Sequence, residues 1–292
     1  HLYTAGYGVF EPRIQRSLHL LFLVPLVFLV FPFNRRSPQH RPSAFDWAWV
    51  TVSWVASAYL IWDHTRLDHR WEGASPVLPV EVVLGSIMAV LVIEACRRSL
   101  SPWMAVTISL SLVYLGTSQW IPGLFNFKGY SFPRMVEFVY LAGDEGMYGF
   151  LTGISANILY IYVLFASVMM RAGVGEWVID VAVKLAGWAR GGPAKIAVVG
   201  SALFGTISGS TVANVYATGS FTIPLMKKGG YSAKGPPAIE AIAGTGGQIM
   251  PPVMGAGVFI MAEITGISYF DIIKAAAIPA MLYYVGLFAM VH

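Results

Sequence analysis

Apolar runs long enough to form spanning helices alternate with short polar segments along the chain. Four such runs precede residue 122, and a fifth follows GLFNFKGYSFPR, a linker rich in glycine, proline and aromatic residues. Each run approaches the ~20 residues that a helix needs to cross about 30 Å of hydrocarbon. We therefore predict five spanning helices in the first 170 residues: Leu18–Phe33, Phe45–Trp62, Leu78–Cys96, Pro102–Trp120 and Gly149–Met170.

The segment after the fifth run mixes apolar and charged residues at close spacing. Glu176, Asp180 and Lys184 stand among valine, isoleucine and leucine residues. Such a mixture favours a helix lying in the membrane interface over a helix that crosses the membrane.

Two apolar arms follow, Pro193–Ile207 and Val212–Met226, separated by the polar tetrapeptide SGST. Each arm is ~22 Å long as a helix, which is short of the hydrocarbon core. Lysines and an arginine flank the pair at both ends. This pattern predicts a re-entrant hairpin over about 193–226 that turns at Ser208–Thr211; the alternative is a pair of ordinary spans.

The next apolar stretch is interrupted in its middle. Pro236–Ala243 and Val253–Ile264 span the membrane only together, and GTGGQIMPP lies between them. We predict a discontinuous helix over about 236–265, with Pro251 and Pro252 as the residues that break it. Irregular backbone at membrane depth is tolerated where it is buried in protein or lines a cavity.

The two interruptions together offer a set of oxygen ligands. Hydroxyls and amides come from both interruptions, and carbonyls come from the glycines of the broken helix. Oxygen donors suit a hard cation such as Na⁺. The candidate residues for binding a cation or a solute are Ser208, Gly209, Ser210, Thr211, Asn214, Gly244, Thr245, Gly246, Gly247 and Gln248.

Two other readings of these segments stay open. Gly205 and Gly209 form a GxxxG pattern, which also serves helix packing. Glu240 either belongs to the site, because carboxylates at membrane depth are costly and usually functional, or lies among the cytoplasmic headgroups near Lys234.

Composition and charge place the chain in a membrane. It is 56% hydrophobic and 12% charged, against about 25% charged residues in soluble domains. The net charge of +4 arises from basic residues in loops, which argues against nucleic-acid binding. The positive-inside rule puts the loops of Arg35, Arg36 and Arg41, and of Arg97 and Arg98, in the cytoplasm. A single cysteine, Cys96, excludes an internal disulfide.

A membrane enzyme is a second functional class. Its one candidate centre is the acidic and histidine-containing segment DHTRLDHRWE, with Asp63, His64, Asp68, His69 and Glu72. The histidines are five residues apart, which does not align them on one helical face. A solvated loop of mixed charge explains this segment, so we expect no enzymatic activity. A third class, a membrane scaffold or anchor without its own solute site, fits the first four helices.

The interrupted segments resemble a known transporter family. ALFGTISGSTVANVYATGSFTIPLMKKGGY, AIAGTGGQIMPPVMGAGVFIMAEITGI and AAAIPAMLYY resemble the large membrane subunit of tripartite ATP-independent periplasmic (TRAP) transporters. LYTAGYGVFEP and VLPVEVVLGSIMAVLVIEACRR resemble the small membrane subunit, fused to the large one as in the TAXI branch. The resemblance covers essentially the whole chain.

The resemblance implies an all-α, multi-pass protein of the bacterial inner membrane. Residues 1–125 would be the four-helix small-subunit-like region, and 126–292 the first inverted repeat of an elevator-type permease. The implied function is secondary import of organic acids such as C4-dicarboxylates, delivered by a periplasmic solute-binding protein and driven by Na⁺ or another cation, with no cofactor. Na⁺ would bind at Ser208, Ser210, Gly244 and Thr245. The family's second repeat is absent, so we expect this chain to be part of a longer protein.

Overall fold

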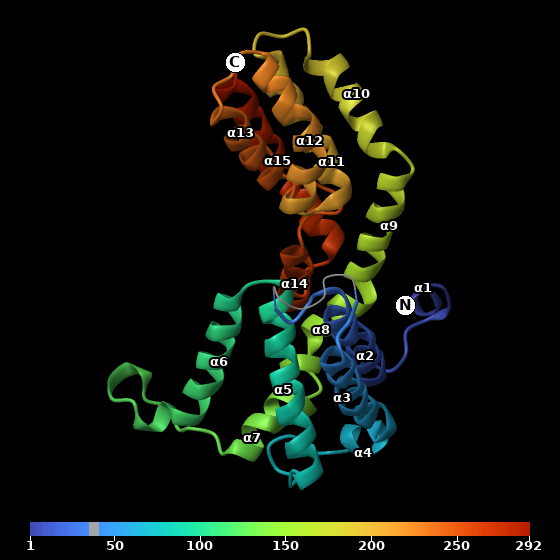
Figure 1. Cartoon of the computed structure of the whole chain (residues 1–292), viewed down its shortest axis with the longest axis vertical. Coiled ribbons are helices and arrows are strands. Elements are labelled where there is room, and N and C mark those ends of the chain that lie inside the picture. Colours follow the sequence, from blue (N-terminus) through green and yellow to red (C-terminus); the bar gives the residue numbers. More distant parts are fainter. Residues whose placement is uncertain (35–40) are drawn as a thin grey trace. The chain divides into compact units, whose positions relative to one another are not determined.

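The computed structural model describes residues 1–34 and 41–292. In the described residues the regular secondary structure is helical throughout (Figure 1). The chain forms two compact units, His1–Asn157 and Ile158–His292. Four helical segments of the described chain are long and apolar enough to cross a membrane: Pro12–Val30, Pro79–Ser99, Phe150–Arg171 and Tyr269–Met290.

The first unit is built on three long helices and the shorter helix α6. Its helices, including short 3-10 and π turns labelled η, are α1 (Leu2–Tyr7), α2 (Pro12–Val30), α3 (Ala44–Trp62), α4 (His64–Asp68), α5 (Pro79–Ser99), α6 (Pro102–Thr117), η1 (Ser118–Trp120), η2 (Gly123–Phe125), α7 (Phe132–Val136), η3 (Glu137–Leu141), η4 (Gly146–Tyr148), α8 (Phe150–Ile154) and the beginning of η5 (Ser155–Leu159).

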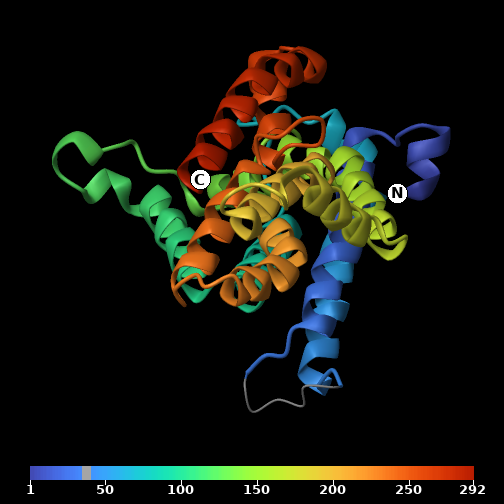
Figure 2. The same ribbon diagram turned by 90° about the horizontal axis from the view of Figure 1, so that it is seen from above.

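Local sequence explains where these helices begin. Prolines occupy the first position of α2, α5 and α6, where no intrahelical N–H is needed. Ser43 and Asp46 form a capping box at the start of α3. Helices α2 and α3 lie side by side (Figures 1 and 2) and share a core with α5 that contains Phe28, Leu60 and Leu91.

Ion pairs that engage buried carboxylates lie at both ends of α5. At its C-terminal end, the Arg98 guanidinium pairs with the carboxylates of Asp46 (2.7 Å) and Glu94 (2.8 Å). At its N-terminal end, Glu81 pairs with Arg66, and nearby Arg70 pairs with Glu137 at 2.9 Å. A helix of α5's length spans about 30 Å, so these polar layers are spaced like the two faces of a hydrocarbon core.

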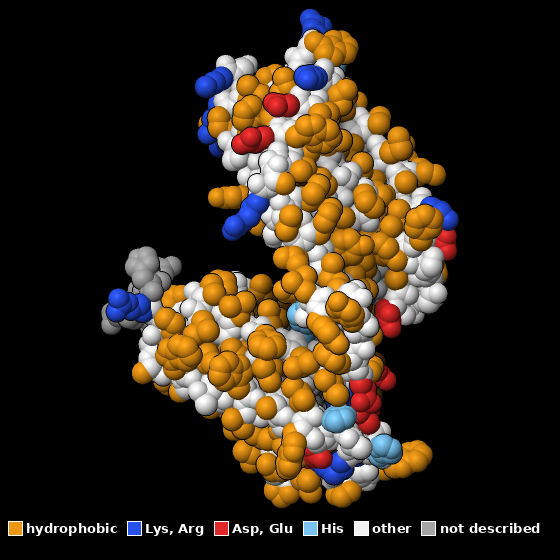
Figure 3. Space-filling model, turned by 90° about the vertical axis from the view of Figure 1, so that its right-hand side faces the viewer, with side chains coloured by type: hydrophobic (Ala, Val, Ile, Leu, Met, Phe, Trp, Pro, Cys, Tyr) orange, Lys and Arg blue, Asp and Glu red, His pale blue; other side chains and the backbone are white. Residues whose placement is uncertain are grey.

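The second unit begins in the long α8–α9 segment and continues as a helical bundle. Its helices are α9 (Tyr160–Arg171), α10 (Val174–Ala186), α11 (Gly192–Ser208), α12 (Thr211–Lys228), α13 (Gly235–Gly246), α14 (Ala256–Thr265) and α15 (Tyr269–Met290). Helices α11, α12, α13 and α15 pack together around Val198, Ala243 and Met226 (Figure 1). The exposed surface of both units carries many large apolar side chains, as a membrane protein requires (Figure 3).

The predicted spans are confirmed at α2, α5 and the α8–α9 segment, and helices also occupy the second and fourth predicted spans. The predicted mixed segment forms α10, whose Val178, Ile179 and Ala182 are buried. Its position in the membrane interface stays a prediction. Arg35 and Arg36, which contributed to the predicted orientation, lie outside the described residues.

The compact units divide later than the predicted boundary at residue 125. The residues after the linker still pack on the first unit, because Tyr140 and Tyr148 are buried there and their hydroxyls bond to Ala56 O (2.6 Å) and Ser57 Oγ (3.2 Å). The division into small-subunit-like and large-subunit regions is a matter of ancestry, and it stays a prediction.

Candidate functional site

The predicted hairpin is present as α11 and α12, joined by a two-residue tip. Gly209 closes α11 in the left-handed conformation (φ 58°), which glycine adopts without steric cost. Ser210 then caps α12, and its hydroxyl accepts a hydrogen bond from Ala213 N at 3.4 Å. The SGST sequence therefore encodes a tight reversal between two helices. Re-entry into a membrane stays a prediction.

The predicted discontinuous helix is also present, as α13 and α14. The irregular segment runs over 247–255 and contains Pro251 and Pro252. It begins three residues later than expected, because α13 continues through Gly246. The carbonyls of Gly244 and Thr245 accept hydrogen bonds from Gly247 N and Gln248 N at 3.1 Å each. The expectation that Gly244 lies in unwound backbone is therefore wrong.

The glycines of this segment allow helices to approach closely. A Cβ atom on Gly246 would lie 2.5 Å from the Tyr283 ring, and one on Gly244 would lie 2.4 Å from Val215 Cγ2. A Cβ on Gly205 would lie 2.6 Å from the Cα of Gly247. These glycines serve backbone-to-helix packing, which is the role that the GxxxG alternative assigned to Gly205.

The hairpin tip touches the irregular segment directly. A Cβ on Gly209 would lie 1.8 Å from the carbonyl oxygen of Met254. Met254 has a positive φ of 51°, the only non-glycine residue of the described chain with that conformation. The two interruptions of helical structure are thus in backbone contact.

A pocket of about 430 Å³ opens where the two interruptions meet. It brings together the predicted site residues Ser208, Gly209, Ser210 and Gln248. The first residues of α14 also line it, so that the helix N-terminus, with its N–H groups lacking intrahelical partners, faces the pocket. The rest of its lining is mostly apolar or aromatic and was not predicted: Leu159, Tyr162, Val163, Val253, Met254, Gly255, Ala256, Gly257 and Phe259.

Aromatic side chains brace this pocket. Phe259 stacks on Tyr269, with ring centroids 4.5 Å apart, and lies 5.5 Å from the Tyr162 ring. The Tyr269 hydroxyl lies 2.7 Å from the carbonyl oxygens of both Pro252 and Val253. A side chain on α15 therefore satisfies carbonyls that the break in the helix leaves without helical partners.

Two hydroxyls next to the tip have no hydrogen-bond partner in the described part of the chain. Ser208 Oγ and Thr211 Oγ1 are both buried, and they flank Gly209 and Ser210. A buried polar group without a partner costs about 1–3 kcal/mol, so native proteins rarely keep one without a reason. A bound cation would supply the missing partner, and the hydroxyl oxygens suit it.

Other predicted site residues lie elsewhere. Thr245 is exposed, and its hydroxyl donates to Ala241 O at 2.8 Å. Asn214 is buried, and its amide donates to Ser201 O at 2.9 Å. Neither side chain lines the pocket.

Glu240, on α13, is fully buried against α11 and α12, and its depth in the membrane stays a prediction. Its carboxyl contacts the hydroxyls of Ser201, Thr218 and Thr222. Sequence inspection missed these three residues. The signal was present on α12, where Asn214, Thr218 and Thr222 recur every four residues and so share one face.

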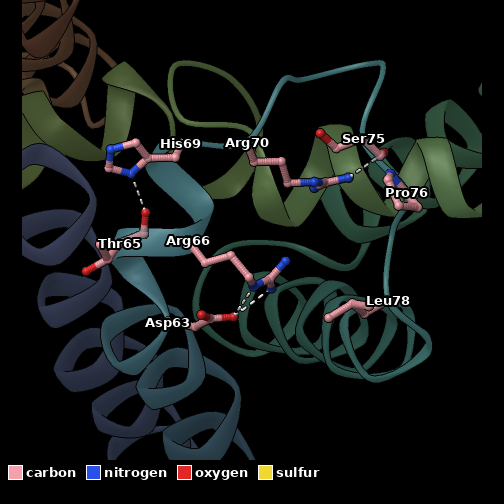
Figure 4. Close-up of a pocket in the computed structure, with 8 residues that line it drawn as sticks. All are labelled: Asp63, Thr65, Arg66, His69, Arg70, Ser75, Pro76 and Leu78. Carbon is pink, nitrogen blue, oxygen red and sulfur yellow. Dashed lines mark hydrogen bonds and ion pairs between the residues drawn. The ribbon is translucent and has the colours of Figure 1, made fainter.

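The acidic and histidine-rich segment of the first unit lies beside a separate open pocket of about 670 Å³ (Figure 4). Asp63 pairs with Arg66, and His69 Nδ1 lies 2.7 Å from Thr65 O. Asp68 and Glu72 are engaged by Arg13 and by Gly143 N. Within the described ranges, no three such side chains are grouped to hold a metal ion.

Comparison with known proteins gives one family. Residues 87–292 match the family described as tripartite ATP-independent periplasmic transporter, DctM component. The match begins inside α5, so it includes part of the region that the sequence assigned to the small subunit. No solved structure matches the chain.

Curated relatives match over shorter stretches. A C4-dicarboxylate TRAP transporter large permease protein of Pseudomonas aeruginosa is 35% identical over 130 residues, 44% of this chain and 30% of that protein. The corresponding protein of Vibrio cholerae is 34% identical over 121 residues, 41% of this chain and 26% of that protein. A 2,3-diketo-L-gulonate TRAP transporter large permease protein of Escherichia coli is 26% identical over 121 residues, 41% of this chain and 28% of that protein. The chain thus aligns with less than a third of each of these relatives.

Proposed function

The chain belongs to the DctM family of tripartite ATP-independent periplasmic transporters, and from this premise we propose that it is part of a cation-coupled permease that imports small organic acids. It is a multi-pass membrane protein of a transporter family. The bacterial inner membrane, the periplasmic solute-binding protein and the second repeat of the permease are parts of the proposal. The fused TAXI-type arrangement is a further part, supported by the helices that precede the family match.

One observation carries the proposal: a pocket lined by Ser208 opens at the contact between hairpin tip and broken helix, and the buried hydroxyls of Ser208 and of Thr211, on the other side of the tip, have no hydrogen-bond partner in the described chain. Ser208 and Thr211 offer oxygen ligands to a cation such as Na⁺. The N-terminus of α14 offers N–H groups and a positive dipole end to a carboxylate. A cation and an organic anion would thus neutralise one another in adjacent positions, which couples their binding.

The first unit fits a supporting role. Its buried ion pairs, such as Arg98 with Asp46, join the ends of different helices. Such contacts favour a rigid frame. We propose that this unit braces the transport machinery; a scaffold without its own solute site remains the alternative function for the chain.

Uptake by proteoliposomes tests the proposal. The complete permease that contains these residues would be reconstituted, supplied with its binding protein, and assayed for uptake of radiolabelled succinate and other C4-dicarboxylates. We expect uptake that requires both the binding protein and an inward Na⁺ gradient. Equal uptake with and without the gradient would contradict the cation coupling, and uptake without the binding protein would contradict that dependence.

A further inference from the structure

The Glu240 carboxyl group is surrounded by hydroxyls within the second unit. Thr218 Oγ1 and Ser201 Oγ contact its Oε1 atom, the latter at 3.1 Å, and Thr222 Oγ1 lies 2.6 Å from Oε2. The side chain has no solvent exposure. The group is absent from the lining of the hairpin-tip pocket, so it forms a second polar centre.

No basic group of the described chain pairs with this carboxyl. Lys195, the charged residue of α11, has its Nζ atom 2.6 Å from His292 Nδ1. The lysines that end α12 are exposed. From α15 the titratable neighbour is Tyr284, whose hydroxyl donates to Ala243 O at 3.0 Å. Only neutral groups therefore face Glu240, and an isolated carboxylate in such surroundings costs many kcal/mol and tends to neutralise.

The hydroxyl protons around Glu240 are too few for its contacts. Thr218 Oγ1 also lies 2.8 Å from Asn214 O, and Thr222 Oγ1 lies 2.9 Å from Thr218 O. Each threonine has one proton but two acceptors within hydrogen-bonding distance. If each proton goes to the carbonyl one turn back, the usual choice for threonine in a helix, neither is left for the carboxylate.

A proton on Glu240 resolves the shortage at Thr222, whose contacts with Glu240 Oε2 and with Thr218 O then have one proton each. The carboxyl O–H then donates to Thr222 Oγ1, and that hydroxyl donates onward to the Thr218 carbonyl. The 2.6 Å separation between Oε2 and Thr222 Oγ1 lies in the range of O–H···O hydrogen bonds, roughly 2.5–3.0 Å. A metal ion with ligand distances of roughly 2.3–2.6 Å, as for Ca²⁺, would hold the oxygens that it bridges farther apart.

We propose that Glu240 is a proton-binding site, separate from the cation site at the hairpin tip, and that it carries its proton in the conformation described here. The Glu240 carboxylate takes up a proton from water on one side of the membrane and becomes a carboxylic acid. It becomes a carboxylate again when it releases the proton to water on the other side. The protonation of Glu240 does not depend on the proposed function. Only its consequence rests on that function: a proton held by this unit would be carried with the solute.

Infrared spectroscopy of the purified complete permease tests the protonation directly. A protonated carboxyl group gives a C=O band that shifts in D₂O, and at pH 7 we expect the wild type to show this band. The E240Q variant should lose it, since the amide replaces the acid at nearly constant shape. The matched control E263Q changes an exposed carboxylate on α14 and should retain the band.

A second variant keeps the test independent of how E240Q folds. T222V removes the hydroxyl that accepts the proposed O–H bond, so the band should move to higher frequency without disappearing. A spectrum that is the same in wild type and E240Q, or a band that T222V leaves in place, would overturn the proposal. Absence of succinate uptake by wild-type proteoliposomes would instead count against the proposed function, and the infrared result would stand.

Discussion

At the scale of single residues, glycines and hydroxyl-bearing side chains determine the geometry of the site. Two features require glycine at position 209: its backbone is left-handed, and its Cα faces the Met254 carbonyl too closely for a Cβ atom. Ser208 and Thr211 have hydroxyls that stabilise nothing within the described protein, which makes them the residues most directly tied to a ligand. Glu240 differs from them, because hydroxyl groups of the protein itself already contact its carboxyl group.

Gly209→Ala tests the contact between tip and broken helix. The left-handed conformation alone costs an L-residue roughly 1–2 kcal/mol, and the added methyl group would force the Met254 backbone away. We expect a lower unfolding temperature in detergent and at least tenfold weaker Na⁺ binding.

The matched control is Gly286→Ala on α15, where the new Cβ meets no atom within 4 Å. Alanine favours a helix over glycine by up to about 1 kcal/mol, so this variant should be neutral or slightly stabilised. Equal stability and Na⁺ affinity in the two alanine variants would show that the tip contact has no role.

At the scale of elements, the sequence predicts the helices well and their detailed ends less well. Apolar run length identified α2, α5 and the α8–α9 segment, and Gly209 and Ser210 fall where the hairpin turn was expected. The start of the broken region was misplaced, because glycine signals both unwinding and close packing. Only the positions of Val215 and Tyr283 in the structure show that Gly244 and Gly246 pack closely against neighbouring helices.

Arg98 illustrates how a buried charge joins three elements of the first unit. It ends α5, pairs with Asp46 at the start of α3, and lies over the ring of Phe28 in α2 (4.9 Å). Removal of one partner of a buried pair typically costs about 3–5 kcal/mol. We expect Arg98→Met to lower the unfolding temperature markedly in a thermal unfolding experiment.

Arg97→Met is the control, because this neighbouring arginine is 39% exposed and its pair with Glu94 is partly open to solvent. Such pairs are worth about 0–1 kcal/mol. If Arg98→Met and Arg97→Met unfold at the same temperature, the buried pair contributes nothing to the frame.

At the scale of the whole molecule, the sequence predicts the family better than it predicts the site. The motifs around SGST and GTGGQIMPP point to the DctM family, and the family match covers them. The aromatic surroundings of the pocket could not be predicted, because the lining residues Tyr162 and Phe259, and Tyr269 stacked behind Phe259, come from three helices whose packing no local pattern specifies. Glu240 could be singled out as a candidate, but its neutral hydroxyl shell required the packing of α11 and α12.

The central claim is that a coupling cation binds where the hairpin tip meets the broken helix. The most direct test is equilibrium binding of ²²Na⁺ to the purified complete permease and to its S208A/T211V variant. The variant should bind Na⁺ at least tenfold more weakly, a loss of about 1.4 kcal/mol. Its stability without sodium should be unchanged or higher, because the lost hydroxyls had no partners.

The control T206V/S220A removes two hydroxyls of the same helices that bond to their own backbone, and it should retain wild-type affinity. Unchanged Na⁺ affinity in S208A/T211V, or an equal loss in the control, would contradict the account.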